Sequence, residues 1–304
     1  MKKRKIRALL LVFCLLQLGA VTGCTRTQQQ DTVTIIDGDF AEMKFFTQIA
    51  RILVEEQTSL KVKVQDSMAS GLAFEQIKAG KMDIYMSYDG SLLAAYLGKD
   101  PADVPEGMTL YEYANQLGQE TANVMLTPKL GQENTYVVAV NPNVAKTWDL
   151  QKISDLKDCA SSLVFAAEHE FFDKGSTHYD AFADFYGLSF KEATTIDRGL
   201  KYAGMSSGNM DATVVYSTDG LNRKFGLVTL VDDQGFFPEY NGAYLIRADL
   251  YDDYPELEKI FTSLEGVFSD EICTNMNYLI DVENQDPYDV AHDFLEENGF
   301  LTER

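Results

Sequence analysis

Histidine is scarce in this chain, which has three among 304 residues. His169, His178 and His292 form no H-E-x-x-H motif and no pair at the spacing of zinc ligands. No stretch has the alternating ligands, central glycine and closing glutamate of a calcium loop. We therefore expect no metal site and no cofactor.

A convincing catalytic nucleophile is also missing. Residues 204–208 match G-x-S-x-G, but a nucleophile elbow follows a strand and starts a helix. Here a helix-like stretch, residues 198–203, precedes the motif and a strand follows it. We interpret the motif as a Gly/Ser connector and expect no enzyme activity.

Cysteine is sparse as well, with four in the chain. Cys14 and Cys24 lie in the first 24 residues, so only Cys159 and Cys273 remain in the body. Two cysteines so far apart give no disulfide framework. Two buried thiols are the main expectation, and a Cys159–Cys273 bridge is the alternative.

Basic residues are outnumbered, with 26 Lys and Arg against 47 Asp and Glu and a net charge of −21. Without the basic N-terminal segment the charge falls to about −26. Such an acidic surface argues against nucleic acid and against binding anionic lipid through a basic patch. The 45% hydrophobic content is nevertheless that of a chain that buries a core.

The N-terminus has the order of an export signal. A basic stretch at residues 2–7 precedes an apolar run at residues 8–21, which is shorter than the roughly 20 residues of a spanning helix. Small residues then lead to Cys24, as in the lipobox of bacterial lipoproteins. This resemblance implies a signal peptide at 1–23 and a lipid on Cys24. A plain signal peptide that contains a cysteine is the alternative.

The body alternates strands and helices, the rhythm of an α/β domain. The pattern predicts strands at 33–36, 60–64, 82–86, 136–140, 163–166, 212–216, 227–231 and 243–246. It predicts helices at 44–56, 72–79, 179–186, 190–193, 198–203, 257–268, 269–280 and 287–297, with a further helix starting at 154–156. Two α/β lobes with a helical C-terminal return are the simplest architecture.

Tyrosines stand at the predicted strand ends and turns. Their segments, with others in the same order, resemble the substrate-binding lipoproteins of ABC importers for quaternary-amine osmoprotectants (glycine betaine, carnitine, choline). The segments are F-A-E at 40–42, D-I-Y-M-S-Y-D-G-S at 83–91, N-T-Y at 134–136, I-S-D-L at 153–156, E-F at 170–171, Y-G-L at 186–188, S-T-D-G at 217–220, D-D-Q-G-F-F-P-E-Y-N at 232–241 and M-N-Y at 276–278.

The resemblance implies a two-lobed α/β fold like that of type II periplasmic binding proteins, with the ligand cleft between the lobes. Lobe I would comprise 32–132 and 241–304, lobe II would comprise 133–240, and 24–31 would be a polar tether. The expected ligand residues are Tyr136, Tyr216 and Tyr240 in an aromatic cage, Asn134 as a polar contact, and Tyr88, Asp89, Ser91 and Tyr111 from lobe I. Among Tyr88, Tyr111 and Tyr113 the fourth aromatic residue of the cage stays open.

The chemistry of a quaternary amine fits such a cage. A trimethylammonium group has no N–H donor, so aromatic faces must select it through the attraction of a cation to the ring quadrupole. The resemblance also implies an ABC permease and an ATPase as partners. A surface enzyme acting on cell-envelope material and a sensor built from a binding lobe are the alternatives.

The chain departs from the family pattern near the expected cleft. Family members carry F-T-E-Q where this chain has F-A-E-M at 40–43, and Y-T-G-T where it has Y-D-G-S at 88–91. The usual arginine after the E-F pair is replaced by Lys174. Because Met43 donates no hydrogen bond and Asp89 would repel a carboxylate, we expect choline to bind more tightly than betaine. Replacing Asp89 by threonine should narrow the difference.

Overall fold

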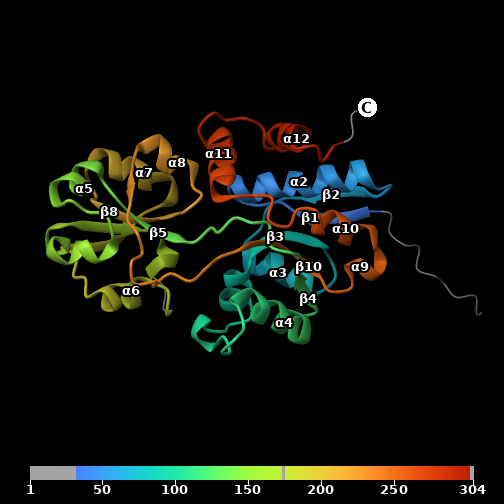
Figure 1. Cartoon of the computed structure of the whole chain (residues 1–304), viewed down its shortest axis with the longest axis horizontal. Helices are drawn as coiled ribbons and strands as arrows, with labels where there is room; N and C mark the ends of the chain where they lie inside the picture. Colours follow the sequence, from blue (N-terminus) through green and yellow to red (C-terminus); the bar gives the residue numbers. More distant parts are fainter. Residues whose placement is uncertain (1–31, 173–174, 302–304) are drawn as a thin grey trace, which may run out of the picture. The chain divides into compact units, whose positions relative to one another are not determined.

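The computed structural model describes residues 32–172 and 175–301 (Figure 1). The predicted signal peptide, Cys24, the tether and Lys174 lie outside these residues. Contacts between residues divide the chain into Met1–Asp31 and Thr32–Arg304. This division does not test the lobe boundaries given above, which stay a prediction. The strands of the described residues form two sheets.

Sheet I has five strands in the order β2-β1-β3-β10-β4. Strand β1 is parallel to β2 and β3, and β10 is antiparallel to β3 and β4. The strands are β1 (Thr32–Ile36), β2 (Lys61–Gln65), β3 (Ile84–Tyr88), β4 (Val124–Leu126) and β10 (Gly242–Arg247). The chain thus leaves sheet I after β4 and returns to it at β10.

Sheet II, built by the intervening residues, also has five strands, in the order β7-β6-β8-β5-β9. Strand β6 is parallel to β7 and β8, and β5 is antiparallel to β8 and β9. The strands are β5 (Tyr136–Val140), β6 (Val164–Ala167), β7 (Glu192–Thr195), β8 (Ala212–Tyr216) and β9 (Val228–Thr229).

Helices cover both sheets. Figure 1 shows α2 and α12 on one side of sheet I and α3 and α4 on the other. The helices connected to sheet I are α2 (Ala41–Gln57), α3 (Ser70–Lys78), α4 (Leu110–Ala122), α9 (Leu250–Asp253), α10 (Glu256–Thr262), α11 (Asp270–Asp281) and α12 (Pro287–Glu297). Those in the sheet II segment are α5 (Pro142–Trp148), α6 (Tyr179–Tyr186), α7 (Arg198–Ser207) and α8 (Gly220–Phe225).

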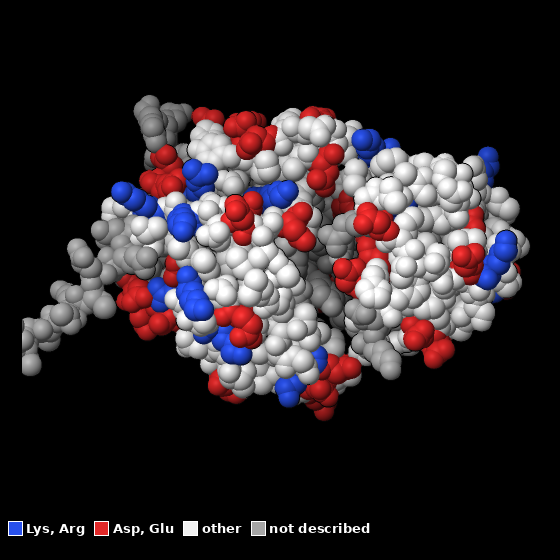
Figure 2. Space-filling model, turned by 180° about the vertical axis from the view of Figure 1, so that it is seen from behind, with Lys and Arg blue, Asp and Glu red and all other residues white. Residues whose placement is uncertain are grey.

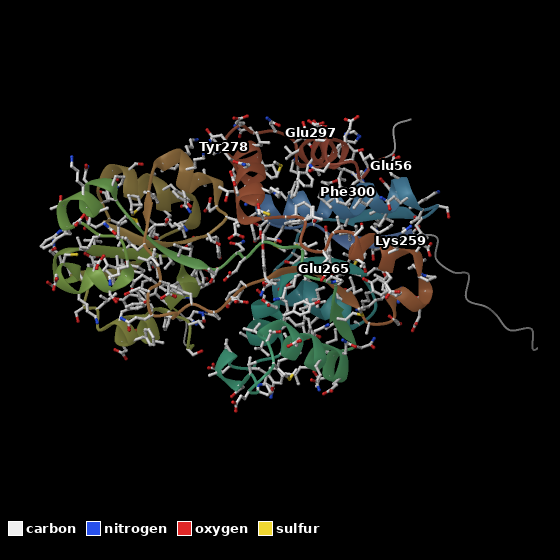
Figure 3. All side chains as sticks on the ribbon, viewed as in Figure 1. Glu56, Lys259, Glu265, Tyr278, Glu297 and Phe300 are labelled. Carbon is white, nitrogen blue, oxygen red and sulfur yellow. The ribbon has the colours of Figure 1, made fainter. Side chains whose placement is uncertain are left out.

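The helix α2 shows how the pattern of apolar residues becomes packing. Phe45, Phe46, Ile49 and Leu53 recur at helical spacing and are all buried in the core on sheet I. Phe46 lies edge-on to Phe268, with ring centroids 4.8 Å apart. At the end of α2, the Gln57 side chain donates to the Phe300 carbonyl, so the C-terminal segment is fastened to this helix (Figure 3).

Helix α11 packs on α2, which is connected to sheet I, and on α8, which lies in the sheet II segment. Gly220, the first residue of α8, lies against the backbone of Tyr278 on α11, which Figure 3 labels. The Arg223 guanidinium lies 5.4 Å from the centre of the Tyr278 ring. This helix therefore connects sheet I to the segment that follows β8.

Most of the predicted elements are confirmed, but the helix expected at 257–268 ends at Thr262 and several other places differ. Residues 190–193 were expected to be helical, but residues 192–195 form the exposed edge strand β7. Residues 204–208 are not a connector: residues 204–207 form the last turn of α7, and Gly208, with a φ of 72°, caps its C-terminal end. The sequence pattern predicts no element at the π-helical segment Ser91–Tyr96, at strand β4 or at helices α4, α5, α8 and α9.

The state of the two cysteines in the body can be checked directly. Cys159 and Cys273 are both free and buried, so the expected thiols are confirmed and the bridge is not formed. In the part of the chain that the structure describes, no helix has the length and apolar character needed to cross a membrane. Figure 2 shows acidic side chains spread over the visible face, with basic ones between them.

Candidate functional site

A cavity of about 760 Å³ lies where strands of the two sheets end. Such a volume is ordinary for a small-molecule site. Six of the predicted site residues line it: Tyr88, Ser91, Asn134, Tyr136, Tyr216 and Tyr240. They come from the end of β3, the start of the π-helical segment that follows it, the start of β5, the end of β8 and the segments that enter β5 and β10.

Sheet II contributes a stack of aromatic rings. Tyr136 and Tyr216 are directly paired across β5 and β8, and their rings are 5.4 Å apart and 20° from parallel. The Phe40 ring, just before α2, lies 6.2 Å from that of Tyr216 and 9° from parallel. Burial raises the pKa of Tyr136 well above its ordinary value, and so does the neighbouring Tyr216, so its phenol stays neutral. This wall of the cavity offers ring faces and no net charge.

Sheet I contributes Tyr88, the last residue of β3, whose side chain is used differently. Its hydroxyl donates to Oε1 of Glu42 at 2.6 Å, and the side-chain amide of Asn134 donates to the Tyr88 hydroxyl at 3.1 Å. Burial and the Glu42 carboxylate both raise the pKa of Tyr88. The hydroxyl is therefore fixed in a buried network, while the residue still lines the cavity.

Tyr240 lies where the chain returns to sheet I. Its carbonyl accepts from the Asn134 backbone N–H at 2.9 Å, which joins the two segments that run between the sheets. A Cβ atom at Gly90 would come within 2.6 Å of the Tyr240 ring. Gly90 is needed here for close approach, because only a residue without a side chain leaves room for the ring.

Asp89 does not line this cavity. Its carboxylate accepts from the backbone N–H of Gly90 at 2.7 Å and from the backbone N–H and side-chain amide of Asn241 at 2.9 and 2.8 Å. Burial raises the pKa of Asp89 to about 6, against the lowering effect of these donors. The Asp89 carboxylate therefore does not face the ligand, and the expected preference for choline loses one of its two reasons, the repulsion of a ligand carboxylate by Asp89.

Tyr111 is not brought to the cavity either. Its hydroxyl donates to the Thr127 carbonyl at 2.7 Å, and the Lys129 ammonium lies 5.4 Å from its ring centre. Burial raises the pKa of Tyr111 to about 12. Tyr113, on the same helix α4, packs against the core of sheet I. Of the three lobe I tyrosines that the sequence left open, only Tyr88 lines the cavity.

Sequence reasoning missed several lining residues. Phe40, Tyr85 and Tyr96 add aromatic surface, and Met43 lines the cavity at the place of the family's glutamine. Phe40 stood in a quoted segment, but its contact with Tyr216, 176 residues away, had no local signal. Tyr96 lies on the π-helical segment that was not predicted.

The charged lining residues favour a cationic ligand. They are Asp39, Asp100 and Glu170 against Lys99. The Ser176 hydroxyl donates to Asp100 at 3.0 Å, so the segment before α6 meets the one after the π-helical segment across the cavity. Carboxylates around an aromatic wall give a field that attracts cations.

A family model described as the substrate binding domain of an ABC-type glycine betaine transport system matches residues 31–297. The chain belongs to this family. Its members are extracytoplasmic substrate-binding proteins of transport systems and not enzymes, so the expected absence of catalysis agrees with the family. The alternative functions, a surface enzyme or a sensor, find no support in it.

Curated relatives support the same assignment. The chain is 28% identical to a carnitine transport binding protein of Listeria monocytogenes over 98% of both chains. It is 28% identical to a glycine-betaine-binding protein of Pseudomonas aeruginosa over 90% of both. It is also 30% identical to an ergothioneine transport permease and binding protein of Helicobacter pylori, over 72% of this chain and 39% of that one.

Solved structures confirm the predicted fold. A crystal structure of a glycine betaine/carnitine/choline ABC transporter protein matches with a TM-score of 0.78 at 24% identity, covering 89% of this chain and 100% of that one. A choline-binding protein in complex with choline matches at 0.62 and 15% identity, over 89% of both chains. The two-lobed, type II periplasmic-binding-protein fold is therefore established for the body of this chain.

Proposed function

We propose that this substrate-binding protein captures a small quaternary amine and delivers it to an ABC permease. The observation that carries the proposal is the meeting of four tyrosines, Tyr88, Tyr136, Tyr216 and Tyr240, on one cavity with a surplus of carboxylates. Ring faces attract a cation that has no donor of its own, each by about 0.5–2 kcal/mol. The names of the relatives point to the same chemical class.

The ligand would act by holding the two lobes together. A cation that contacts Tyr88 at the end of β3 in sheet I and Tyr136 and Tyr216 in β5 and β8 of sheet II has more contacts when the lobes are closed. Tyr240, in the segment that leads to β10, adds a further ring. Only the closed form would then be recognised by the permease and its ATPase. The relatives' names leave carnitine, glycine betaine and ergothioneine as candidates. Choline is favoured by the departure at 40–43 alone, because Met43 lines the cavity and offers no donor to a ligand carboxylate.

The decisive experiment separates charge from shape. The chain without residues 1–24 is titrated by calorimetry with choline and with 3,3-dimethylbutanol, its uncharged carbon analogue. Choline should bind at least about tenfold more tightly, because loss of the cation removes the attraction to the rings, about 1.4 kcal/mol or more. Carnitine, betaine and ergothioneine complete the panel. Equal binding of choline and its analogue, or binding of none of the panel, would refute the proposal.

We also propose that a lipid on Cys24 anchors the protein outside the cytoplasm. The support is the order of a basic stretch, a short apolar run and small residues before Cys24. Replacing Cys24 by alanine should move the protein from washed membranes to the soluble fraction without changing its fold. Retention of the Cys24→Ala variant in the membranes would contradict the anchor.

A further inference from the structure

Glu42 is a carboxylate buried between the ligand cavity and the rest of the molecule. It is the second residue of α2 and is 0% exposed. It does not line the cavity, although the preceding Phe40 and the following Met43 do. Its place in the first turn of a helix favours a negative charge.

Four side-chain donors converge on this carboxylate, and they divide between its two oxygens. Oε1 accepts from the Tyr88 hydroxyl at 2.6 Å and from the Asn134 amide at 3.2 Å. Oε2 accepts from the Thr218 hydroxyl at 2.6 Å and from the Asn277 amide at 3.3 Å. The Asn277 amide also donates to the Thr218 carbonyl at 2.8 Å, which closes the network.

The division follows the architecture. The donors to Oε1, Tyr88 and Asn134, line the ligand cavity. The donors to Oε2, Thr218 and Asn277, do not line it but line a small neighbouring cavity of about 80 Å³, which shares Asn134 with the ligand cavity. Thr218 follows strand β8 of sheet II, and Asn277 lies on α11. One carboxylate thus connects two walls of the ligand cavity to sheet II and to the helix that packs on both sides.

These four donors are uncharged groups, so the carboxylate depends on all of them. Burial raises the pKa of Glu42, while the hydrogen bonds from Thr218, Tyr88, Asn277 and Asn134 lower it. Removing one donor leaves a buried charge partly unsatisfied, which costs more than an ordinary hydrogen bond. A shift of the Thr218 segment would therefore move the Glu42 carboxylate and change its hydrogen bonds with Tyr88 and Asn134.

We infer that Glu42 is a positioning residue of the binding site. Glu42 holds the Tyr88 and Asn134 side chains in the positions that bind the ligand, and these positions depend on where Thr218 lies. The cage is thereby coupled to the arrangement of the two lobes. The inference rests on the proposed function, since the effect it predicts is on the binding of a quaternary amine.

The test uses a residue away from the ligand cavity. Thr218→Val removes the donor to Oε2 at nearly constant volume, and it should weaken binding of choline about tenfold in calorimetric titrations. Thr218→Ser keeps the hydroxyl and should bind within about twofold of the wild type. Thr229→Val, on the exposed end of β9, is the matched control. Normal binding by a folded Thr218→Val variant would overturn the inference.

A double-mutant cycle tests whether the two oxygens act as one unit. Tyr88→Phe keeps the ring but removes the donor to Oε1, with Tyr288→Phe on the surface as its control. If both donors act through Glu42, the double variant Tyr88→Phe with Thr218→Val should lose clearly less affinity than the product of the two single losses. Losses that simply multiply would show that Glu42 does not couple the two sides.

The failure of this inference can be told apart from that of the proposed function. If the wild type binds no quaternary amine, the proposed function is wrong. The same double-mutant cycle is then measured on the free energy of unfolding in urea, without ligand. Coupling between Tyr88→Phe and Thr218→Val in the free energy of unfolding would still support the link through Glu42. Additive effects there would overturn it.

Discussion

The two sheets follow one pairing scheme. In each, the strand at the second place of the sheet order is parallel to both neighbours, and the strand at the fourth place is antiparallel to the third strand and to a short edge strand. Strand β3 of sheet I therefore corresponds to β8 of sheet II, and β10 corresponds to β5. Both β3 and β8 end in a tyrosine, Tyr88 and Tyr216, at the cavity.

The two corresponding tyrosines have different surroundings. Tyr216 lies in a stack of rings with Tyr136 and Phe40. Tyr88 has its hydroxyl fixed by Glu42 and Asn134. The same strand ends thus supply ring faces on one side and a rigid polar support on the other. Both features help a two-sided cage, because ring faces that are already held in position lose less conformational freedom when they bind a cation.

The largest expected effect concerns a glycine after each of these strand ends. A Cβ at Gly220 would come within 2.5 Å of the Tyr278 backbone nitrogen, whereas at Gly90 it would meet the side chain of Tyr240. Backbone cannot give way, so Gly220→Ala should destabilise the fold by about 3 kcal/mol, and Gly90→Ala by less. Gly90→Ala should instead weaken ligand binding by displacing Tyr240.

Urea unfolding and calorimetric titration of the two variants separate these outcomes. The glycine comparison would be wrong if Gly90→Ala were the less stable of the two and bound ligand normally. It would also be wrong if Gly220→Ala unfolded at the wild-type urea concentration.

Much of the fold followed from the spacing of apolar residues, and the exceptions have physical reasons. In helix α4 the fully buried residues are the small Ala114, Gly118 and Ala122, and the larger apolar residues Leu110, Tyr113 and Leu117 are only partly buried. Strand β7 is an edge strand whose four residues are all exposed, so it lacks the alternation of a half-buried strand. Apolar patterns are clearest where large side chains are fully buried, and neither element has a fully buried large side chain.

The site was predictable only in part. Strand ends and turns indicated Tyr88, Tyr136, Tyr216 and Tyr240, because side chains at the ends of strands in an α/β fold meet at one edge. The direction of a side chain at a turn was not predictable, and Asp89 bonds to Asn241 instead of facing the cavity. The network around Glu42 joins residues up to 235 positions apart, which no local pattern reports.

The next effect is on the pH dependence of stability and concerns Asp89, in the turn that follows β3 of sheet I. Asp89 has its pKa raised from 3.8 to about 6 in the folded state, chiefly by burial. Between these values the folded state holds the proton more tightly than the unfolded state, so this contribution is present below about pH 4 and is lost as the pH rises through about 6. The loss amounts to about 2–3 kcal/mol.

An Asp89→Asn variant tests this sign. The stability of the variant relative to the wild type should increase by about 2–3 kcal/mol between pH 4 and pH 7, measured by urea unfolding at each pH. Other buried carboxyls titrate in both proteins and cancel in the difference. Asp252→Asn, an exposed change, controls for the loss of one negative charge. Parallel stability curves for Asp89→Asn and the wild type would contradict the assignment.

The aromatic walls give the third prediction, which contrasts faces with a hydroxyl. Alanine at Tyr136, Tyr216 or Tyr240 should each weaken binding of the quaternary amine by about 1–2 kcal/mol, because a ring face is lost. Phenylalanine at Tyr216 should cost less, since the face remains. At Tyr88 phenylalanine should cost about as much as alanine does at Tyr216, because the bond to Glu42 is lost. Calorimetry that found all three alanine variants normal would exclude the cage.

The smallest effect concerns ligand choice. Met43 lines the cavity and its thioether donates no hydrogen bond, so a ligand carboxylate near it has no partner there. Met43→Gln restores an amide donor at similar volume and should strengthen betaine binding relative to choline about fivefold, or about 1 kcal/mol. Since Asp89 is engaged by Gly90 and Asn241, Asp89→Thr should leave the choline-to-betaine ratio unchanged, contrary to the sequence-based expectation. Titration of both ligands against both variants decides between these two sources of selectivity. If the choline-to-betaine ratio changed with Asp89→Thr and not with Met43→Gln, the charge of Asp89, and not a donor on α2, would set the preference.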